Sequence, residues 1–113
     1  MDRMERNTAG PTFTHSKVDE SATIVHVQGE LDIDSADALR DALETAEESV
    51  ETILRLDASG VTFLDSSGIG VLVKAAQRSH ATGHTLRTRA ERDNVWRTLQ
   101  VTNLADLLHP DRD

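Results

Sequence analysis

Two adjacent serines, Ser66 and Ser67, are the residues whose types and position most clearly suggest chemistry. They follow an apolar run that ends at Asp65, and they precede Gly68 and a second apolar run, so they stand where a strand gives way to a helix. The first backbone N–H groups of a helix have no partner within the helix and can hold an anion. The sequence therefore predicts that a phosphate added to Ser67 would be tolerated and would be visible to a partner.

The same two serines also fit a purely structural role. A serine hydroxyl at a helix start accepts a hydrogen bond from an early N–H group, which is worth typically about 1 kcal/mol. Capping by Ser66 or Ser67 and modification of Ser67 are compatible, and the local sequence leaves both open.

Catalytic templates do not fit this region. Neither serine has, two positions earlier, the glycine of a nucleophile elbow, and Gly68-Ile69-Gly70 lacks the further residues of a phosphate-binding loop. Asp32 and Asp65 could in principle hold Mg²⁺, which accepts one or two carboxylates together with phosphate oxygens. The five histidines are scattered, at His15, His26, His80, His84 and His109. We therefore predict no enzymatic activity, no cofactor and no metal site.

Length and composition narrow the classes of protein. The 113 residues fit one domain, and the formal charge of −8 disfavours direct binding to nucleic acid. Cysteine is absent, which excludes disulfides and thiolate sites. No apolar run has the roughly 20 residues of a membrane span, and the N-terminus lacks an apolar signal core. We expect a cytoplasmic protein.

The elements that must position the serines follow from the apolar pattern. Residues 1–11 read as a flexible tail, 12–18 and 23–27 as a hairpin, and Gly29-Glu30-Leu31-Asp32 as a break after the second strand. A helix starts at Ala36 behind Asp34 or Ser35 as cap, and a strand covers 52–57. The order strand, helix, strand predicts a parallel crossover.

The second half continues in the same alternation. We expect a turn after the strand at 52–57, a helix over 67–80, a left-handed cap at Gly83 and a strand at 85–88. A helix at 91–100 would bury Val95, Trp96 and Leu99, and 104–108 makes a last apolar turn. This pattern predicts a mixed sheet covered by helices.

Two helix faces carry further predictions. The first helix shows an acidic stripe that reads as a solvated face, formed by Asp37, Asp41, Glu44, Glu47, Glu48 and Glu51. On the helix after the serines, about 100° per residue places four residues against the sheet, namely Ile69, Leu72, Val73 and Ala76. Val71 then points away from the sheet with Lys74 and Arg78, as a candidate partner contact or an incidental exposed residue.

Three segments together resemble the STAS family, and in particular bacterial anti-sigma factor antagonists. They are GELD at 29–32, LDASGVTFLDSSGIGVL at 56–72 and VTNLADLL at 101–108, of which the DSSG core is the most specific. The resemblance covers residues 12–108 and leaves 109–113 as a polar tail. It implies a single α/β domain with a mixed, mostly parallel sheet of four to five strands and about four helices.

The resemblance also implies a switch. The second serine of the motif, Ser67, would be phosphorylated by an anti-sigma factor that doubles as a serine kinase, and a serine phosphatase would reverse the modification. The unphosphorylated form would bind the anti-sigma factor and release sigma factor. Asp32, Asp65 and Ser66 would neighbour the phosphorylation site. Predicted partner contacts are Gly68, Ile69, Val71 and Lys74.

Two other functions remain open. An accessory STAS subunit of a membrane transport complex for lipids or anions would use the same fold without needing to modify the serine. A stressosome-type scaffold component would instead belong to a very large assembly, whereas an antagonist is expected to be a monomer or small oligomer. The complete DSSG motif favours the antagonist.

Overall fold

The computed structural model describes residues 12–17, 22–48, 53–101 and 104–111. These residues form five strands and four helices. They are β1 (Thr12–Lys17), β2 (Ala22–Leu31), α1 (Ala36–Glu47), β3 (Ile53–Leu64), α2 (Ser66–Ala81), β4 (Thr85–Ala90), α3 (Asp93–Leu99), α4 (Leu104–Leu108) and β5 (Pro110–Asp111). The predicted tail at 1–11 lies outside the described residues.

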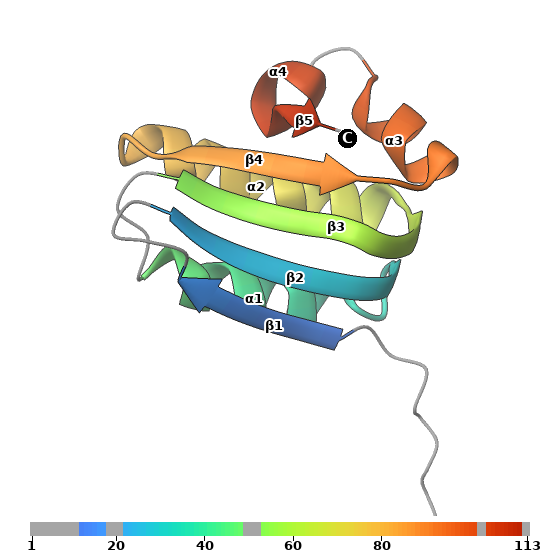
Figure 1. The fold of residues 1–113 in the computed structure, drawn as a ribbon, viewed down its shortest axis with the longest axis horizontal. Helices are drawn as coiled ribbons and strands as arrows, with labels where there is room; N and C mark the ends of the chain where they lie inside the picture. Colours follow the sequence, from blue (N-terminus) through green and yellow to red (C-terminus); the bar gives the residue numbers. More distant parts are fainter. Residues whose placement is uncertain (1–11, 18–21, 49–52, 102–103, 112–113) are drawn as a thin grey trace, which may run out of the picture.

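The strands form one sheet in the order β1-β2-β3-β4-β5, which follows the chain (Figure 1). β1 runs antiparallel to β2, as the predicted hairpin requires, and β2, β3, β4 and β5 are mutually parallel. The expected α/β fold with a mixed, mostly parallel sheet is therefore confirmed.

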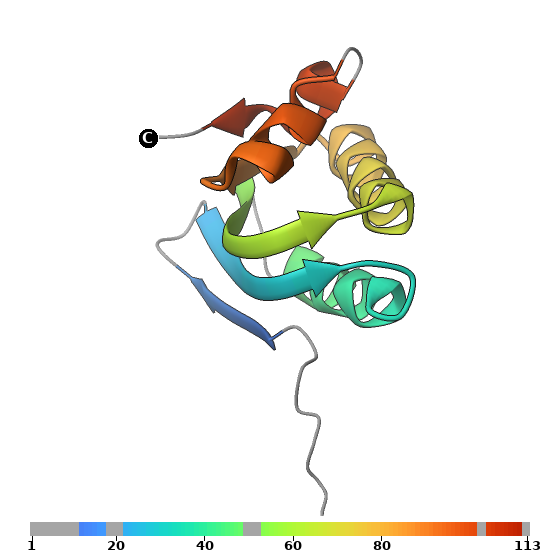
Figure 2. The ribbon, with the colours of Figure 1, turned by 90° about the vertical axis from the view of Figure 1, so that its right-hand side faces the viewer.

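Both crossover helices, α1 and α2, cover the same face of the sheet (Figure 2). Since β2, β3 and β4 follow one another in the sheet, connections of the same right hand place their helices on one side. α3 and α4 lie at the β4 side of the sheet. The helices thus bring the start of α2 next to the start of α1.

The core lies between the sheet and these helices. It is aliphatic, because alternate residues of β2, β3 and β4 and one stripe of each helix point into it. Its almost fully buried side chains are mainly leucines, among them Leu31, Leu39, Leu43, Leu54, Leu56, Leu72, Leu86, Leu99 and Leu108. Each such side chain stabilises the fold by about 1.5–3 kcal/mol relative to exposure.

β2 continues through the segment that was predicted to break it, so that prediction is wrong. Gly29 adopts a left-handed φ of 102° and the pairing with β3 shifts register around it, after which Leu31 is again buried. An irregularity of this kind inserts a residue without ending the strand.

β3 likewise extends to Leu64, whereas the sequence predicts a strand only over 52–57 followed by a turn. Gly60 lies where β2 approaches closely, since an added Cβ would lie 2.8 Å from Cγ of Gln28. The glycine permits strand pairing here and does not mark a turn.

The chain after α2 matches its predicted order. Gly83 has a φ of 80° directly after the helix end, which confirms the left-handed cap. Val95 and Leu99 are buried in α3 and Trp96 is half-buried beside them. Within the segment predicted as a polar tail, Pro110 and Asp111 form β5 and pair with β4.

Candidate functional site

The two serines lie where the ends of two parallel strands meet. The Asp65 N–H donates to the backbone carbonyl of Leu31 at 3.1 Å, which ties the end of β3 to the end of β2. α2 begins one residue later at Ser66. The β2–α1 loop and the start of α2 are therefore neighbours, in keeping with the tendency of parallel sheets to place sites at their carboxyl ends.

Gly68 is buried because α2 approaches β2 closely at this point. A Cβ on Gly68 would lie 2.8 Å from Cδ1 of Leu64 and 3.0 Å from the carbonyl oxygen of Leu31. The latter is backbone and already accepts the Asp65 N–H. Gly68 thus allows the junction to close.

Asp65, and neither serine, caps α2. Its Oδ1 accepts hydrogen bonds from the N–H groups of Ser67 at 2.8 Å and Gly68 at 3.2 Å. The interpretation of Ser66 or Ser67 as the cap is wrong, since Asp65 has the extended backbone of an N-cap and its side chain accepts both of these N–H groups. Two of the N–H groups expected to be free for an anion are therefore already occupied by a carboxylate.

The two serine side chains are accessible to different extents. Ser66 is exposed and Ser67 is half-buried. No hydrogen bond joins the Ser67 hydroxyl to another of the described residues. This hydroxyl is consequently free to react without loss of a structural contact.

Asp32 lies in the loop that follows β2, beside the start of α2. Its Oδ1 accepts the N–H groups of Asp34 and Ser35, both at 3.1 Å. The Ser35 hydroxyl in turn accepts the Asp32 N–H at 2.9 Å and donates to the carbonyl of Glu30 at 3.0 Å. Asp32 thus fixes this loop, while Ser35, the N-cap of α1, makes no side-chain capping bond.

The residues predicted to contact a partner differ in accessibility. Lys74 is exposed, Ile69 and Val71 are half-buried against the core, and Gly68 is buried and offers no side-chain surface. Val71 does share a pocket with Lys74, on the side of α2 that the helical periodicity predicts. The helical periodicity predicts that Val73 packs against the sheet. In the structure Val73 is only half-buried, and Ala75 is fully buried.

Two apolar residues near the serines were not found from the sequence. Ile33, next to Asp32, is 74% exposed, and Phe63, near the end of β3, is 44% exposed. Both lie at the carboxyl end of the parallel strands. Their exposure could not be predicted, because Ile33 sits in a segment with no periodicity and Phe63 lies beyond the expected end of its strand.

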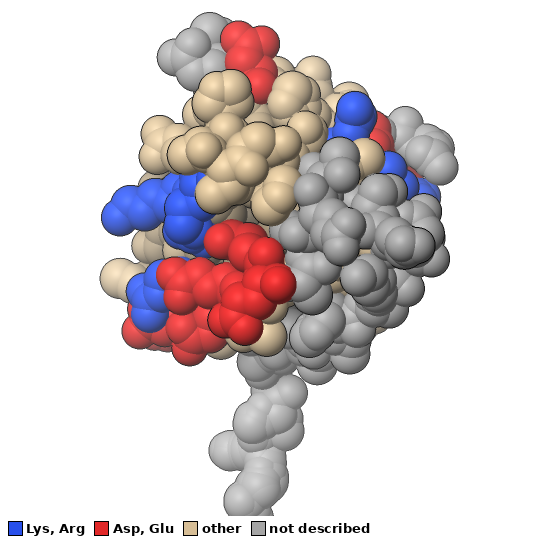
Figure 3. Space-filling view, turned by 90° about the vertical axis from the view of Figure 1, so that its left-hand side faces the viewer, with Lys and Arg blue, Asp and Glu red and all other residues tan. Residues whose placement is uncertain are grey.

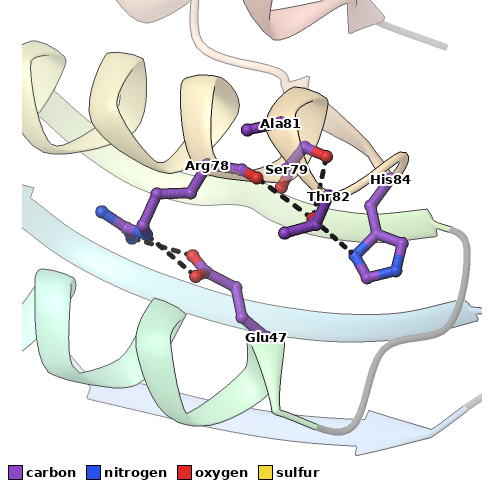
Figure 4. Close-up of a pocket in the computed structure, with 6 residues that line it drawn as sticks. All are labelled: Glu47, Arg78, Ser79, Ala81, Thr82 and His84. Atoms are coloured by element: carbon purple, nitrogen blue, oxygen red, sulfur yellow. Dashed lines mark hydrogen bonds and ion pairs between the residues drawn. The ribbon is translucent and has the colours of Figure 1, made fainter.

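α1 and α2 are joined at their far ends by an ion pair. Nε and Nη2 of Arg78 donate to the two carboxylate oxygens of Glu47 at 2.9 and 2.8 Å (Figure 4). These hydrogen bonds raise the pKa of the Arg78 guanidinium, although partial burial opposes the rise. The pair lies beside a pocket of about 290 Å³ that Thr82 and His84 also line.

The acidic stripe of α1 is largely solvated, as predicted. Asp37, Asp41, Glu44 and Glu48 are exposed, whereas Glu47 is half-buried in its pair with Arg78, and Glu51 lies outside the described residues. Figure 3 shows a patch of acidic side chains, in red, on one side of the molecule, with basic side chains adjoining it.

A second polar constellation lies on the opposite face of the sheet. Nδ1 of His26 lies 3.1 Å from Oδ2 of Asp57. Burial would raise the pKa of the Asp57 carboxyl, but hydrogen bonds from Ser59 and from His26 lower it below its usual value. This pair was missed because the two residues are 31 positions apart.

A family model described as "Mlab, STAS domain" matches residues 15–109. The chain belongs to the STAS domain family. This confirms the resemblance drawn from the DSSG motif and its flanking segments.

Other STAS proteins are similar over most of this chain. The anti-sigma-B factor antagonist of Listeria monocytogenes is 30% identical over 84 residues, which cover 74% of each protein. An anti-sigma factor antagonist from Mycobacterium paratuberculosis superposes with a TM-score of 0.79 at 25% identity, covering 92% of this chain and 87% of the other.

SpoIIAA of Bacillus, solved in its phosphorylated form, has a TM-score of 0.64 and 21% identity, with 88% of this chain and 91% of the other covered. At that identity the likeness concerns the fold alone. Within the described part of this STAS domain, no helix is long and apolar enough to cross a membrane. Nor do three or more of its described His, Asp or Glu side chains cluster as metal ligands would.

Proposed function

We propose that this STAS domain is an anti-sigma factor antagonist. In its unphosphorylated form it binds an anti-sigma factor and thereby releases sigma factor. The anti-sigma factor, acting as a serine kinase, phosphorylates Ser67 and ends the binding, and a serine phosphatase restores it. Relatives that carry the name of antagonist support the proposal. So does the hydroxyl of the half-buried Ser67, which makes no hydrogen bond to the described residues.

The modification is a phosphoryl transfer. The Ser67 oxygen forms a bond to the γ-phosphorus of ATP, the bond from that phosphorus to the bridging oxygen of ADP breaks, and the hydroxyl proton passes to a base of the kinase. The STAS domain supplies only the acceptor. We therefore propose that it has no enzymatic activity of its own.

The negative charge of a phosphate on Ser67 is sufficient to release the domain from the anti-sigma factor. A phosphoserine carries about −1.5 to −2 charges. Against carboxylates a few ångströms away, at an effective dielectric constant of 20 with some screening, the penalty in an interface is on the order of 2–5 kcal/mol. That corresponds to a loss of affinity of roughly 30-fold to several thousand-fold. No refolding of the domain is required.

The experiment is incubation with the candidate kinase and ATP, followed by mapping of the modified residue. We expect phosphate on Ser67 only. Ser67→Ala should stay bound to the kinase in ATP, and Ser67→Asp should bind weakly. Ser66→Ala is the matched control, since Ser66 is adjacent and exposed, and it should behave as wild type. Equal binding of all forms would refute the proposal.

The other expectations follow from this role. We propose a cytoplasmic protein that acts as a monomer or small oligomer and does not contact nucleic acid itself. Its charge of −8 supports the last point, because phosphate backbones repel it.

A second function has one observation in its favour, namely that the matching family model is described as Mlab and not as an antagonist. In that case the domain would be an accessory subunit of a membrane transport complex, and Ser67 would not need modification. Capture by a transporter ATPase or permease domain, together with no phosphorylation by the candidate kinase, would favour this alternative. A neighbouring gene for a serine-kinase anti-sigma factor would argue against it.

A further inference from the structure

A pocket of about 240 Å³ lies between α1 and α2, directly beside the two serines. On α2 its lining includes Ser67, Val71, Lys74 and Arg78. These residues follow one another at intervals of four, three and four, so they form a single stripe along the helix. Arg40 of α1 closes the other side.

The three cationic side chains of this pocket differ in how they pair with carboxylates. Arg78 is held by both carboxylate oxygens of Glu47. Arg40 lies 3.0 Å from a carboxylate oxygen of Asp37 and 3.8 Å from one of Asp41, and these two side chains are 85% and 73% exposed. Lys74 is exposed, and none of the described carboxylates lies within ion-pair distance of it. Among the described residues, the pocket therefore holds one cation without a carboxylate partner, Lys74, and a second, Arg40, whose two carboxylate partners are solvated.

The opposite side of Ser67 is unfavourable for an anion. The N–H groups of Ser67 and Gly68 already donate to Asp65, whose carboxylate is negative. Asp32 adds a second carboxylate in the neighbouring loop. A phosphate on Ser67 would be repelled from that side and attracted toward the cations along the helix.

We propose that the phosphate on Ser67 turns into this pocket and pairs with Lys74 of α2 and Arg40 of α1. Lys74 lies seven residues after Ser67, a rise of about 10 Å, and long side chains on a helix lean back toward its N-terminus. Its ammonium is thus directed toward the phosphate. The bound phosphate would bridge the two helices and cover Val71 at the base of the pocket.

This inference rests on the proposed function only in that it concerns the same serine. The test is independent of any kinase if phosphoserine is incorporated at position 67 during translation. The readout is the second pKa of the phosphate, followed by phosphorus NMR at low ionic strength. Cations that pair with the dianion lower this pKa from its ordinary value of about 6.

We expect the second pKa of the phosphorylated domain to lie about 0.5–1 unit below that of a phosphoserine peptide. Lys74→Gln should move it back by about half of that shift, and Arg40→Gln should act in the same direction. Arg97→Gln is the matched control, since Arg97 is an exposed cation on α3, and it should leave the pKa unchanged. Circular dichroism would establish that each variant is folded.

Titrations that are the same for wild type, Lys74→Gln and Arg97→Gln would overturn the inference. So would a phosphate pKa equal to that of the peptide. If the kinase fails to modify Ser67 while the incorporated phosphate still shows the Lys74-dependent shift, the proposed function fails and the pocket assignment stands.

Discussion

Asp65 and Ser67 lie two positions apart and make different contributions at the start of α2. Asp65 accepts two backbone N–H groups, whereas no described residue is hydrogen-bonded to the Ser67 hydroxyl. This separation means that a chemical change at Ser67 need not unravel the helix. It also places the carboxylate of Asp65 beside Ser67.

Substitutions at this junction should separate capping from reactivity. Asp65→Ala should lower the free energy of unfolding by about 1 kcal/mol, because two N–H groups lose their acceptor. Asp65→Asn keeps an acceptor oxygen, and Ser67→Ala removes no capping bond, so both should stay within about 0.5 kcal/mol of wild type. Urea denaturation measures all three. A loss for Ser67→Ala as large as that for Asp65→Ala would mean that the serine also caps the helix.

At the scale of elements, α2 can pack closely against β2 and β3 because Gly68 has no side chain. Gly70, two residues later, is exposed and has no atom within 4 Å of where a Cβ would lie. The two glycines of the motif are therefore not equivalent. One permits a close approach of elements, and the other lies on an open surface of the helix.

The two glycines predict opposite effects of the same substitution. Gly68→Ala should destabilise the fold by about 1–3 kcal/mol, because its Cβ would press on Leu64 and on the Leu31 carbonyl. Gly70→Ala should stabilise it by about 0.5–1 kcal/mol, since alanine loses less entropy in a helix. Thermal unfolding of both variants is the measurement. Similar effects of the two changes would show that the approach at Gly68 is not tight.

The strands show where local sequence stops being sufficient. Alternation correctly located the starts of β2 and β3, and the spacing of apolar residues located α1 and α2. The segment from Gly29 was interpreted as a break after its strand, and the residues after position 57, which include Gly60, as a turn, because glycine usually marks a turn in an isolated segment. In the sheet, Gly29 accommodates a register shift and Gly60 the approach of Gln28. Only the partner strand resolves that ambiguity.

At the scale of the whole molecule, crossovers of one hand place the β2–α1 loop, the end of β3 and the start of α2 at one edge of the sheet. The DSSG motif and its helical stripe were predicted from their own sequence, so Ser67, Asp65 and Lys74 were named in advance. Arg40 and Ile33 were not, because they reach the site through the packing of α1 beside α2 and through the Leu31–Asp65 bond. Long-range packing adds the second cation and the apolar surface.

That apolar surface yields the last prediction. Ile33 lies in the β2–α1 loop beside the serines and is 74% exposed, whereas Val101, 56% exposed, lies between α3 and α4. If the carboxyl edge of the sheet binds the anti-sigma factor, Ile33→Ser should weaken that binding at least about fivefold, as the loss of a contact worth over 1 kcal/mol does. Val101→Ser removes another exposed apolar side chain away from that edge and should bind as wild type. Both variants should keep wild-type stability within about 0.5 kcal/mol, since neither side chain is buried. The measurement is calorimetric titration of the anti-sigma factor with each unphosphorylated variant of the domain. If Ile33→Ser binds with wild-type affinity, or if Val101→Ser loses as much affinity as Ile33→Ser, the interface lies away from the serine edge.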